Sequence, residues 1–108
     1  MELVILNTSI LTSEGAFNLK NISLEEARDI MKENKENFIS AIGHQSTADI
    51  LTTLLGVNIE MNRINFVQEK GQKALVFKLL ARAEEGRILT IEEIEEIGYK
   101  FQLLEKLN

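Results

Sequence analysis

Several residue types are missing from this chain, and each absence removes a class of function. The 108 residues include no cysteine, which excludes disulfide bonds and metal sites built from thiolates. Proline and tryptophan are also absent, and histidine occurs once. No apolar run approaches the ~20 residues that a membrane helix needs, and the first residues lack the charges and cleavage site of a signal peptide. We therefore expect a soluble protein of the cytoplasm.

The chain is also short of positive charge, with a formal net charge of −5. A protein that coats nucleic acid usually presents a broad basic face, so this balance argues against that function. It leaves room for a small concave site in which a few arginines converge. The length fits a single domain over residues 1–108, and the 44% of hydrophobic residues can form one small core.

Hydrophobic periodicity predicts a small α+β domain, with a mixed sheet of about five strands and helices packed on it. The segments with strand patterns are residues 2–7, 17–22, 38–42, 64–67, 74–80 and 99–107. In the second segment, Phe17 and Leu19 should point inward. The polar run at residues 69–72 predicts a hairpin turn between two strands.

Two helix starts are marked by capping boxes. Ser23 with Glu26, and Thr90 with Glu93, have the spacing at which an N-cap hydroxyl and an N3 carboxylate bond to each other's backbone N–H groups. The first motif predicts a helix to about residue 35, and the second a helix to about residue 98.

The single histidine, His44, stands where a predicted strand gives way to a predicted helix. Gly43 lets a ligand approach the backbone closely, and Ser46 or Thr47 is expected to cap a helix that ends near Gly56. Imidazole gives or takes a proton near neutral pH, and a helix N-terminus attracts anions. This combination indicates proton transfer beside a phosphate. The alternative is a histidine with only a structural hydrogen bond.

Two arginines could hold such a phosphate. Arg63 follows Asn62 just before a predicted strand, and Arg82 begins a polar turn after the apolar run at residues 74–80. Arginine can bind a phosphate through two parallel hydrogen bonds, and Glu85 could orient Arg82. The alternatives are a solvated arginine at a strand edge and an ordinary helical ion pair between Arg82 and Glu85. The sequence pattern does not choose between them.

Other chemistries lack their signatures. One histidine and no cysteine leave only carboxylates as further metal ligands, and no cluster of Asp and Glu has ligand spacing, so we expect no metal and no cofactor. The chain has no phosphate-binding glycine loop and no nucleophile elbow. A catalytic triad would have to combine His44 with Asp29 or Asp49, the only aspartates, and Asp49 follows His44 by five residues inside a predicted helix, a poor geometry.

Five short motifs stand in a fixed order along the chain. They are Leu6-Asn7-Thr8-Ser9, Ala41-Ile42-Gly43-His44-Gln45-Ser46-Thr47, Leu54-Leu55-Gly56, Asn62-Arg63 and Arg82-Ala83-Glu84-Glu85-Gly86-Arg87-Ile88-Leu89. Their order and spacing resemble the viral type III anti-CRISPR ring nuclease family, formerly a domain of unknown function. The resemblance covers nearly the whole chain and implies a protein of a virus or mobile element.

The resemblance implies a homodimer that binds cyclic tetra-adenylate, the messenger of type III CRISPR defence, across its two-fold axis. It also implies metal-independent cleavage, in which a ribose 2′-hydroxyl attacks the adjacent phosphate and the 5′-oxygen leaves. Two such cuts give linear di-adenylate with a 2′,3′-cyclic phosphate. Loss of the messenger then counters the defence.

The resemblance further assigns roles to residues. The family's catalytic histidine falls on His44, which would protonate the leaving 5′-oxygen. The family's arginine and glutamate fall on Arg82, which would stabilise charge on phosphorus, and on Glu85, which would orient Arg82. The expected ligand contacts are Arg63, Asn7, Thr8, Ser9, Gly43, Gln45, Ser46, Thr47 and Asn62. The family's loop serine matches Ser9 only with a one-residue shift, because Ile10 stands at the unshifted position.

Three other functions stay open. A viral regulator would use Arg63 and Arg82 to bind nucleic acid, although the net charge and the lack of a basic stripe argue against it. A non-catalytic sponge would sequester the cyclic nucleotide with the same arginines but without needing His44. A structural oligomer module would leave the junction at His44 without a chemical role.

Overall fold

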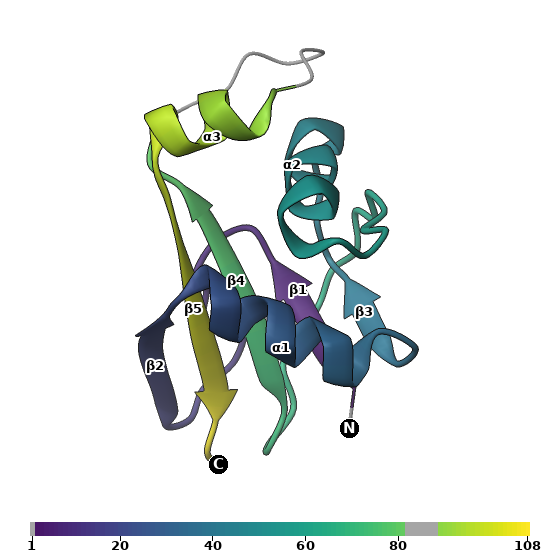
Figure 1. Ribbon diagram of the computed structural model, residues 1–108. Helices are drawn as coiled ribbons and strands as arrows, with labels where there is room; N and C mark the ends of the chain where they lie inside the picture. The colour runs from purple at the N-terminus through teal and green to yellow at the C-terminus, as the bar shows by residue number, and fades with distance from the viewer. Residues whose placement is uncertain (1, 82–88) are drawn as a thin grey trace.

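A mixed sheet of five strands, in the order β2-β5-β4-β1-β3, organises the fold (Figure 1). The computed structural model describes residues 2–81 and 89–108. Its strands are β1 (Leu3–Leu6), β2 (Phe17–Ile22), β3 (Phe38–Ser40), β4 (Lys73–Leu79) and β5 (Tyr99–Lys106). The helices within these ranges are α1 (Leu24–Asn34), α2 (Gln45–Leu55) and α3 (Ile91–Ile97). The predicted α+β class is confirmed, and no described helix is long and apolar enough to cross a membrane.

The sheet has a parallel half and an antiparallel half. Strand β1 pairs in parallel with β3 on one side and with β4 on the other. Strand β5 pairs antiparallel with both β4 and β2. Because β1, β3 and β4 run in one direction, the loops that follow them gather at the same edge of the sheet.

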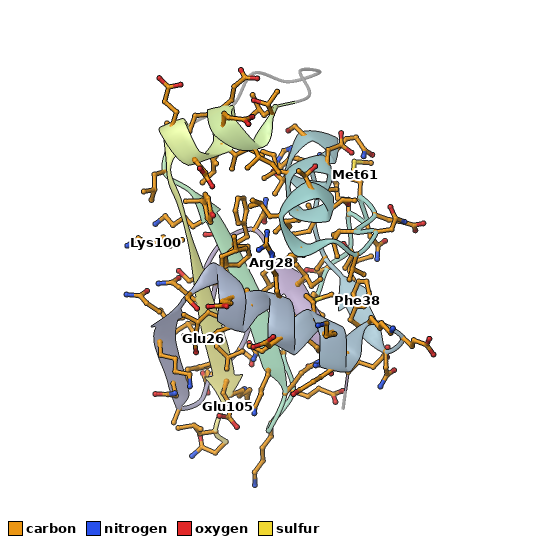
Figure 2. The ribbon with its side chains drawn as sticks, viewed as in Figure 1. Glu26, Arg28, Phe38, Met61, Lys100 and Glu105 are labelled. Atoms are coloured by element: carbon orange, nitrogen blue, oxygen red, sulfur yellow. The ribbon has the colours of Figure 1, made fainter. Side chains whose placement is uncertain are left out.

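Helices α1 and α2 lie on one face of the sheet (Figure 1). Alternate strand side chains point to this face and meet the apolar stripes of the two helices. The buried cluster includes Ile5, Leu75, Phe77 and Phe101 of the strands and Ala27, Met31, Leu51 and Leu54 of the helices. Arg28 of α1, labelled in Figure 2, donates a 2.8 Å hydrogen bond from Nε to the Leu54 carbonyl and so joins α1 to the end of α2.

Irregular segments pack against the other face. The buried cluster there consists of Val4, Leu6, Ala74, Val76 and Leu104. The buried Gln68 donates from Nε2 to the carbonyls of Gln72 (2.7 Å) and Leu104 (3.0 Å), and from its backbone N–H to Thr12 Oγ1 (2.7 Å). Through its backbone and its side chain, this one residue thus joins the segment after β1, the segment before β4 and strand β5. Burial on both faces accounts for the continuous apolar runs of β1 and β4.

The predicted strand at residues 64–67 is wrong, because this segment is irregular. Ile64 is exposed, and Phe66 is half-buried against the second cluster. The apolar alternation therefore reflects one inward side chain rather than strand pairing. Without a first strand there is no hairpin, but the predicted turn is confirmed, since the Gln72 N–H donates to the Glu69 carbonyl at 3.0 Å.

Two smaller predictions also differ from the structure. Leu19 is 45% exposed rather than inward, because β2 is an edge strand with β5 as its neighbour. Strand β3 ends at Ser40, and Ala41 adds only a hydrogen bond from its N–H to β1. Both predicted capping boxes are confirmed, with Ser23 and Thr90 each bonded reciprocally to the glutamate three residues on.

Candidate functional site

A cleft of about 440 Å³ opens where the parallel strands end. It receives residues from the loop after β1, from the start of α2 and from the end of β4. The lining residues are Asn7, Thr8, His44, Ser46, Thr47, Ile50, Phe77, Lys78, Leu79, Leu80 and Ala81. The carboxyl ends of parallel strands are where open sheets tend to bind ligands. Candidate residues from two separate sequence motifs therefore meet at one place in the fold.

His44 is the N-cap residue of α2. Its backbone is extended (φ −131°, ψ 132°), and its carbonyl accepts the first helical hydrogen bond from the Ala48 N–H at 3.1 Å. Its side chain makes no capping hydrogen bond. The prediction that Ser46 or Thr47 caps this helix is wrong, because the chain turns helical at Gln45 and both hydroxyl residues lie in the first turn.

The cleft has a polar rim and an apolar floor. His44 and Thr8 are exposed at the rim, and Asn7, Ser46 and Thr47 are half-buried. The floor includes Ile50 and Phe77, which are 3% and 1% exposed and belong to the main core. The floor is thus part of the packed core, whereas the rim comes from the loop after β1 and from the start of α2. The N-terminus of α2 adds the favourable field that such a terminus gives to an anion.

Lys78 is a cleft residue that sequence reasoning missed. It lies near the carboxyl end of β4, on the strand face opposite Phe77, and pairs in register with Lys100 of β5. Figure 2 labels Lys100. Like charges directly opposite each other on a sheet are destabilising, so a nearby anion would relieve the pair. The available signal was a lysine that interrupts an apolar strand just before its end.

Asn62 and Arg63 do not line this cleft. Asn62 donates from Nδ2 to the Ser40 carbonyl at 2.7 Å, and Arg63 donates from Nη2 and Nε to the Gly43 carbonyl at 2.9 and 3.3 Å. Both side chains thus hold the chain that leads from β3 to His44. Arg63 reaches the peptide next to His44, whereas the side chain of Asn62 bonds to Ser40, four residues before the histidine.

Asn62 borders a separate hollow of about 520 Å³ on the outer side of β3. The hollow is lined by Phe38, Ile39, Ser40, Asn58, Glu60, Met61 and Asn62, and Phe38 and Met61 are labelled in Figure 2. Although it is the larger of the two, it contains neither His44 nor any residue of α2. We therefore place the candidate site in the smaller cleft.

Three further predicted contacts also lie outside the lining of the cleft. Gln45 donates from Nε2 to Asp49 Oδ1 at 2.8 Å along the outside of α2. Ser9 is exposed and follows the lining residue Thr8. Gly43 is covered by a side chain, because a Cβ built on it would lie 3.6 Å from Nε of Arg63. The glycine therefore faces an arginine, not open space for a ligand.

Arg82 and Glu85 lie outside the described residues. Arg82 follows Ala81, a lining residue, directly in the sequence. Within residues 2–81 and 89–108, no group of three or more His, Cys, Asp and Glu side chains could hold a metal ion.

Comparison with known proteins places this chain in a family. The residue pattern of the STIV B116-like family matches residues 3–101. The protein YddF of Bacillus subtilis (strain 168) is 40% identical over 108 residues, which is the whole of both chains. Protein 26 of a Sulfolobus islandicus filamentous virus is 41% identical over 108 residues, covering 95% of this chain and 90% of its own.

The fold is shared as well. The solved structure of B116 of Sulfolobus turreted icosahedral virus is similar to this chain with a TM-score of 0.83 and 25% sequence identity. The match covers 97% of this chain and 99% of B116. Because pattern, sequence and fold agree over nearly the whole length, the chain belongs to the STIV B116-like family.

Proposed function

We propose that this protein is a metal-independent ring nuclease that cleaves cyclic tetra-adenylate to linear di-adenylate with a 2′,3′-cyclic phosphate, and so counters type III CRISPR defence. One observation carries the proposal. The only imidazole of the chain shares a cleft with hydroxyl and amide side chains at the N-terminus of a helix. A proton donor beside a phosphate-binding helix terminus is what attack by a ribose 2′-hydroxyl requires.

In the proposed reaction, the 2′-oxygen bonds to phosphorus as the bond between phosphorus and the 5′-oxygen breaks. The proton of the 2′-hydroxyl passes to solvent, and the imidazolium of His44 donates a proton to the departing 5′-oxygen. Exposure of His44 at the rim makes the imidazole accessible to the ligand. By the resemblance, Arg82 stabilises the charge on phosphorus and Glu85 orients Arg82.

Local charge supports an anionic ligand despite the net charge of −5. Lys78 lines the cleft, and its cross-strand partner Lys100 adds a second positive charge beside it. Positive charges at the border of a cleft attract a small polyanion even in an acidic protein. The apolar floor, with Ile50 and Phe77, suits the flat face of a nucleobase.

The proposed homodimer is supported by an exposed apolar patch, which we define as Ile10, Leu11, Ile64 and Val67. The bond between Thr12 and Gln68 brings the two segments that carry these residues together. Ile10 belongs to the same loop as the lining residues Asn7 and Thr8. A second copy packed on this patch would bring two clefts near one two-fold axis, which matches the symmetry of a ring of four phosphates.

The test is incubation with cyclic tetra-adenylate in EDTA, followed by chromatography and mass spectrometry, with His44→Ala in parallel. We expect linear di-adenylate with a cyclic phosphate from the native protein and an intact ring from the variant. Tight binding without cleavage by either protein would indicate a sponge. Binding of long DNA or RNA that weakens steeply with salt, without binding of the ring, would indicate a nucleic-acid regulator.

A further inference from the structure

The segment that ends at His44 is held from outside by a second segment, residues 60–63. The Ser40 hydroxyl donates to the Glu60 carbonyl at 2.6 Å, and Asn62 Nδ2 donates back to the Ser40 carbonyl at 2.7 Å. The Asn62 N–H also donates to the Ile42 carbonyl at 2.8 Å. These bonds continue the edge of the sheet beyond β3, up to the residue before Gly43.

Arg63 completes this arrangement at the peptide next to the imidazole. Its guanidinium directs Nη2 (2.9 Å) and Nε (3.3 Å) at the carbonyl of Gly43, which is the carbonyl of the peptide bond to His44. Two donors on one oxygen fix both the position and the tilt of that peptide plane. A lysine ammonium carries the same charge but lacks the rigid fork.

We propose that Arg63 is a positioning residue for His44: it holds the Gly43–His44 peptide so that the imidazole stays at the rim of the cleft. The catalytic consequence rests on the proposed function, whereas the positioning itself does not. Misplacement of a catalytic group by about 1 Å can lower a rate by roughly 10²-fold. This role differs from a ligand contact, which depends mainly on the positive charge of the side chain.

The test compares three variants under single-turnover conditions with saturating cyclic tetra-adenylate. Arg63→Lys keeps the charge and removes the fork, and Asn62→Ala weakens the same attachment without changing charge. Lys70→Ala removes one charge from the exposed turn before β4, at the opposite end of that strand. For Arg63→Lys we expect a cleavage rate about 10- to 100-fold lower with ligand affinity changed less than about threefold. Asn62→Ala should also lower the cleavage rate, and Lys70→Ala should cleave at the native rate.

A second experiment on the same variants needs no substrate. His44 is the only histidine, so its ring gives a single set of imidazole signals in NMR spectra, and hydrogen exchange can follow residues 41–44. We expect changed imidazole signals and faster exchange at these residues in Arg63→Lys, and native behaviour in Lys70→Ala. A native cleavage rate in Arg63→Lys, or lost affinity with an intact rate, would overturn the inference. If the native protein does not cleave the ring, the proposed function fails, but the positioning role of Arg63 is still tested by this second experiment. Native imidazole signals and native hydrogen exchange in Arg63→Lys would overturn that role.

Discussion

The parallel and antiparallel halves of the sheet have different roles. The loop after β1, the start of α2 and the end of β4 line the cleft, and His44 is the N-cap residue of the helix that follows β3. Strands β5 and β2 instead carry aromatic contacts and a buried lysine, Lys106, that holds the segment after β1. Under the proposed function, catalysis and the anchoring of segments would occupy separate parts of one small sheet. Substitutions in the two halves should therefore have separable effects on turnover and on stability.

The largest expected effect is on turnover alone. His44→Ala should lower the rate of ring cleavage by about 10²- to 10⁴-fold, the contribution usual for a general acid. Because the side chain of His44 is exposed, the free energy of unfolding should change by about 1 kcal/mol or less. Product chromatography and chemical denaturation measure the two quantities. A native rate in this variant would remove His44 from the mechanism.

A loss of comparable size, this time in the free energy of unfolding, is expected from a core substitution in the antiparallel half. Phe101 of β5 is 1% exposed, and its ring centroid lies 5.3 Å from that of Phe77 and 5.8 Å from that of Tyr99. Phe101→Ala should lower the free energy of unfolding by about 3–5 kcal/mol, as measured in urea. Phe101→Leu should lose less, and its folded fraction should cleave the ring at a near-native rate. A specific loss of turnover in the stable variant would contradict the separation of roles.

An intermediate loss of stability is expected at the attachment of the segment after β1. Lys106 is 8% exposed, donates from Nζ to Ser13 Oγ and to the Glu14 carbonyl at 2.5 Å each, and lies 5.3 Å from the ring centroid of Phe17. Lys106→Met should lower the free energy of unfolding by about 1.5–3 kcal/mol, because hydrogen bonds from a charged donor are lost. The exposed Lys20 of β2 provides the control, and Lys20→Met should change stability by no more than about 0.5 kcal/mol.

The smallest expected effect concerns affinity. Lys78→Ala should raise the Kd for cyclic tetra-adenylate roughly two- to fivefold, as for one exposed ion pair. The difference from the native protein should shrink as salt is added, because salt screens exposed charges. Lys20→Ala, which removes the same charge from the other half of the sheet, should leave the Kd unchanged in a calorimetric titration. Equal effects of the two variants would mean that Lys78 acts only through net charge.

Local signals in the sequence predicted much of this fold. The capping boxes at Ser23 and Thr90 are confirmed because both partners of each motif lie within one turn of helix. Gly56 ends α2 with φ of 71°, as its type and place indicated. The continuous apolar runs of β1 and β4 indicated buried strands for the same local reason. Residues after β1 and before α2 were also singled out correctly as neighbours of strand ends.

Contacts between distant segments could not be predicted in this way. The order of strands places β4 beside β1, and periodicity carries no information about such neighbours. The run at residues 64–67 has the alternation of a strand, yet the side chain of Gln68 and the contacts of Phe66 decide its path. The bond from Arg63 to the Gly43 carbonyl joins residues twenty positions apart, and no local pattern in the sequence indicates it.

The place of β5 has a consequence for how the chain is made. It is the last strand in sequence of the described chain, yet it lies between β2 and β4 within the sheet. Strand β2 therefore has no partner until nearly all of the described chain has left the ribosome. Such non-local pairing makes folding slower. Until β5 is available, the unpaired β2 is prone to aggregation. Strand β2 carries the polar residues Asn18, Lys20 and Asn21. Charged and polar side chains disfavour edge-to-edge pairing with other chains, so they lower the risk of aggregation before β5 pairs with β2.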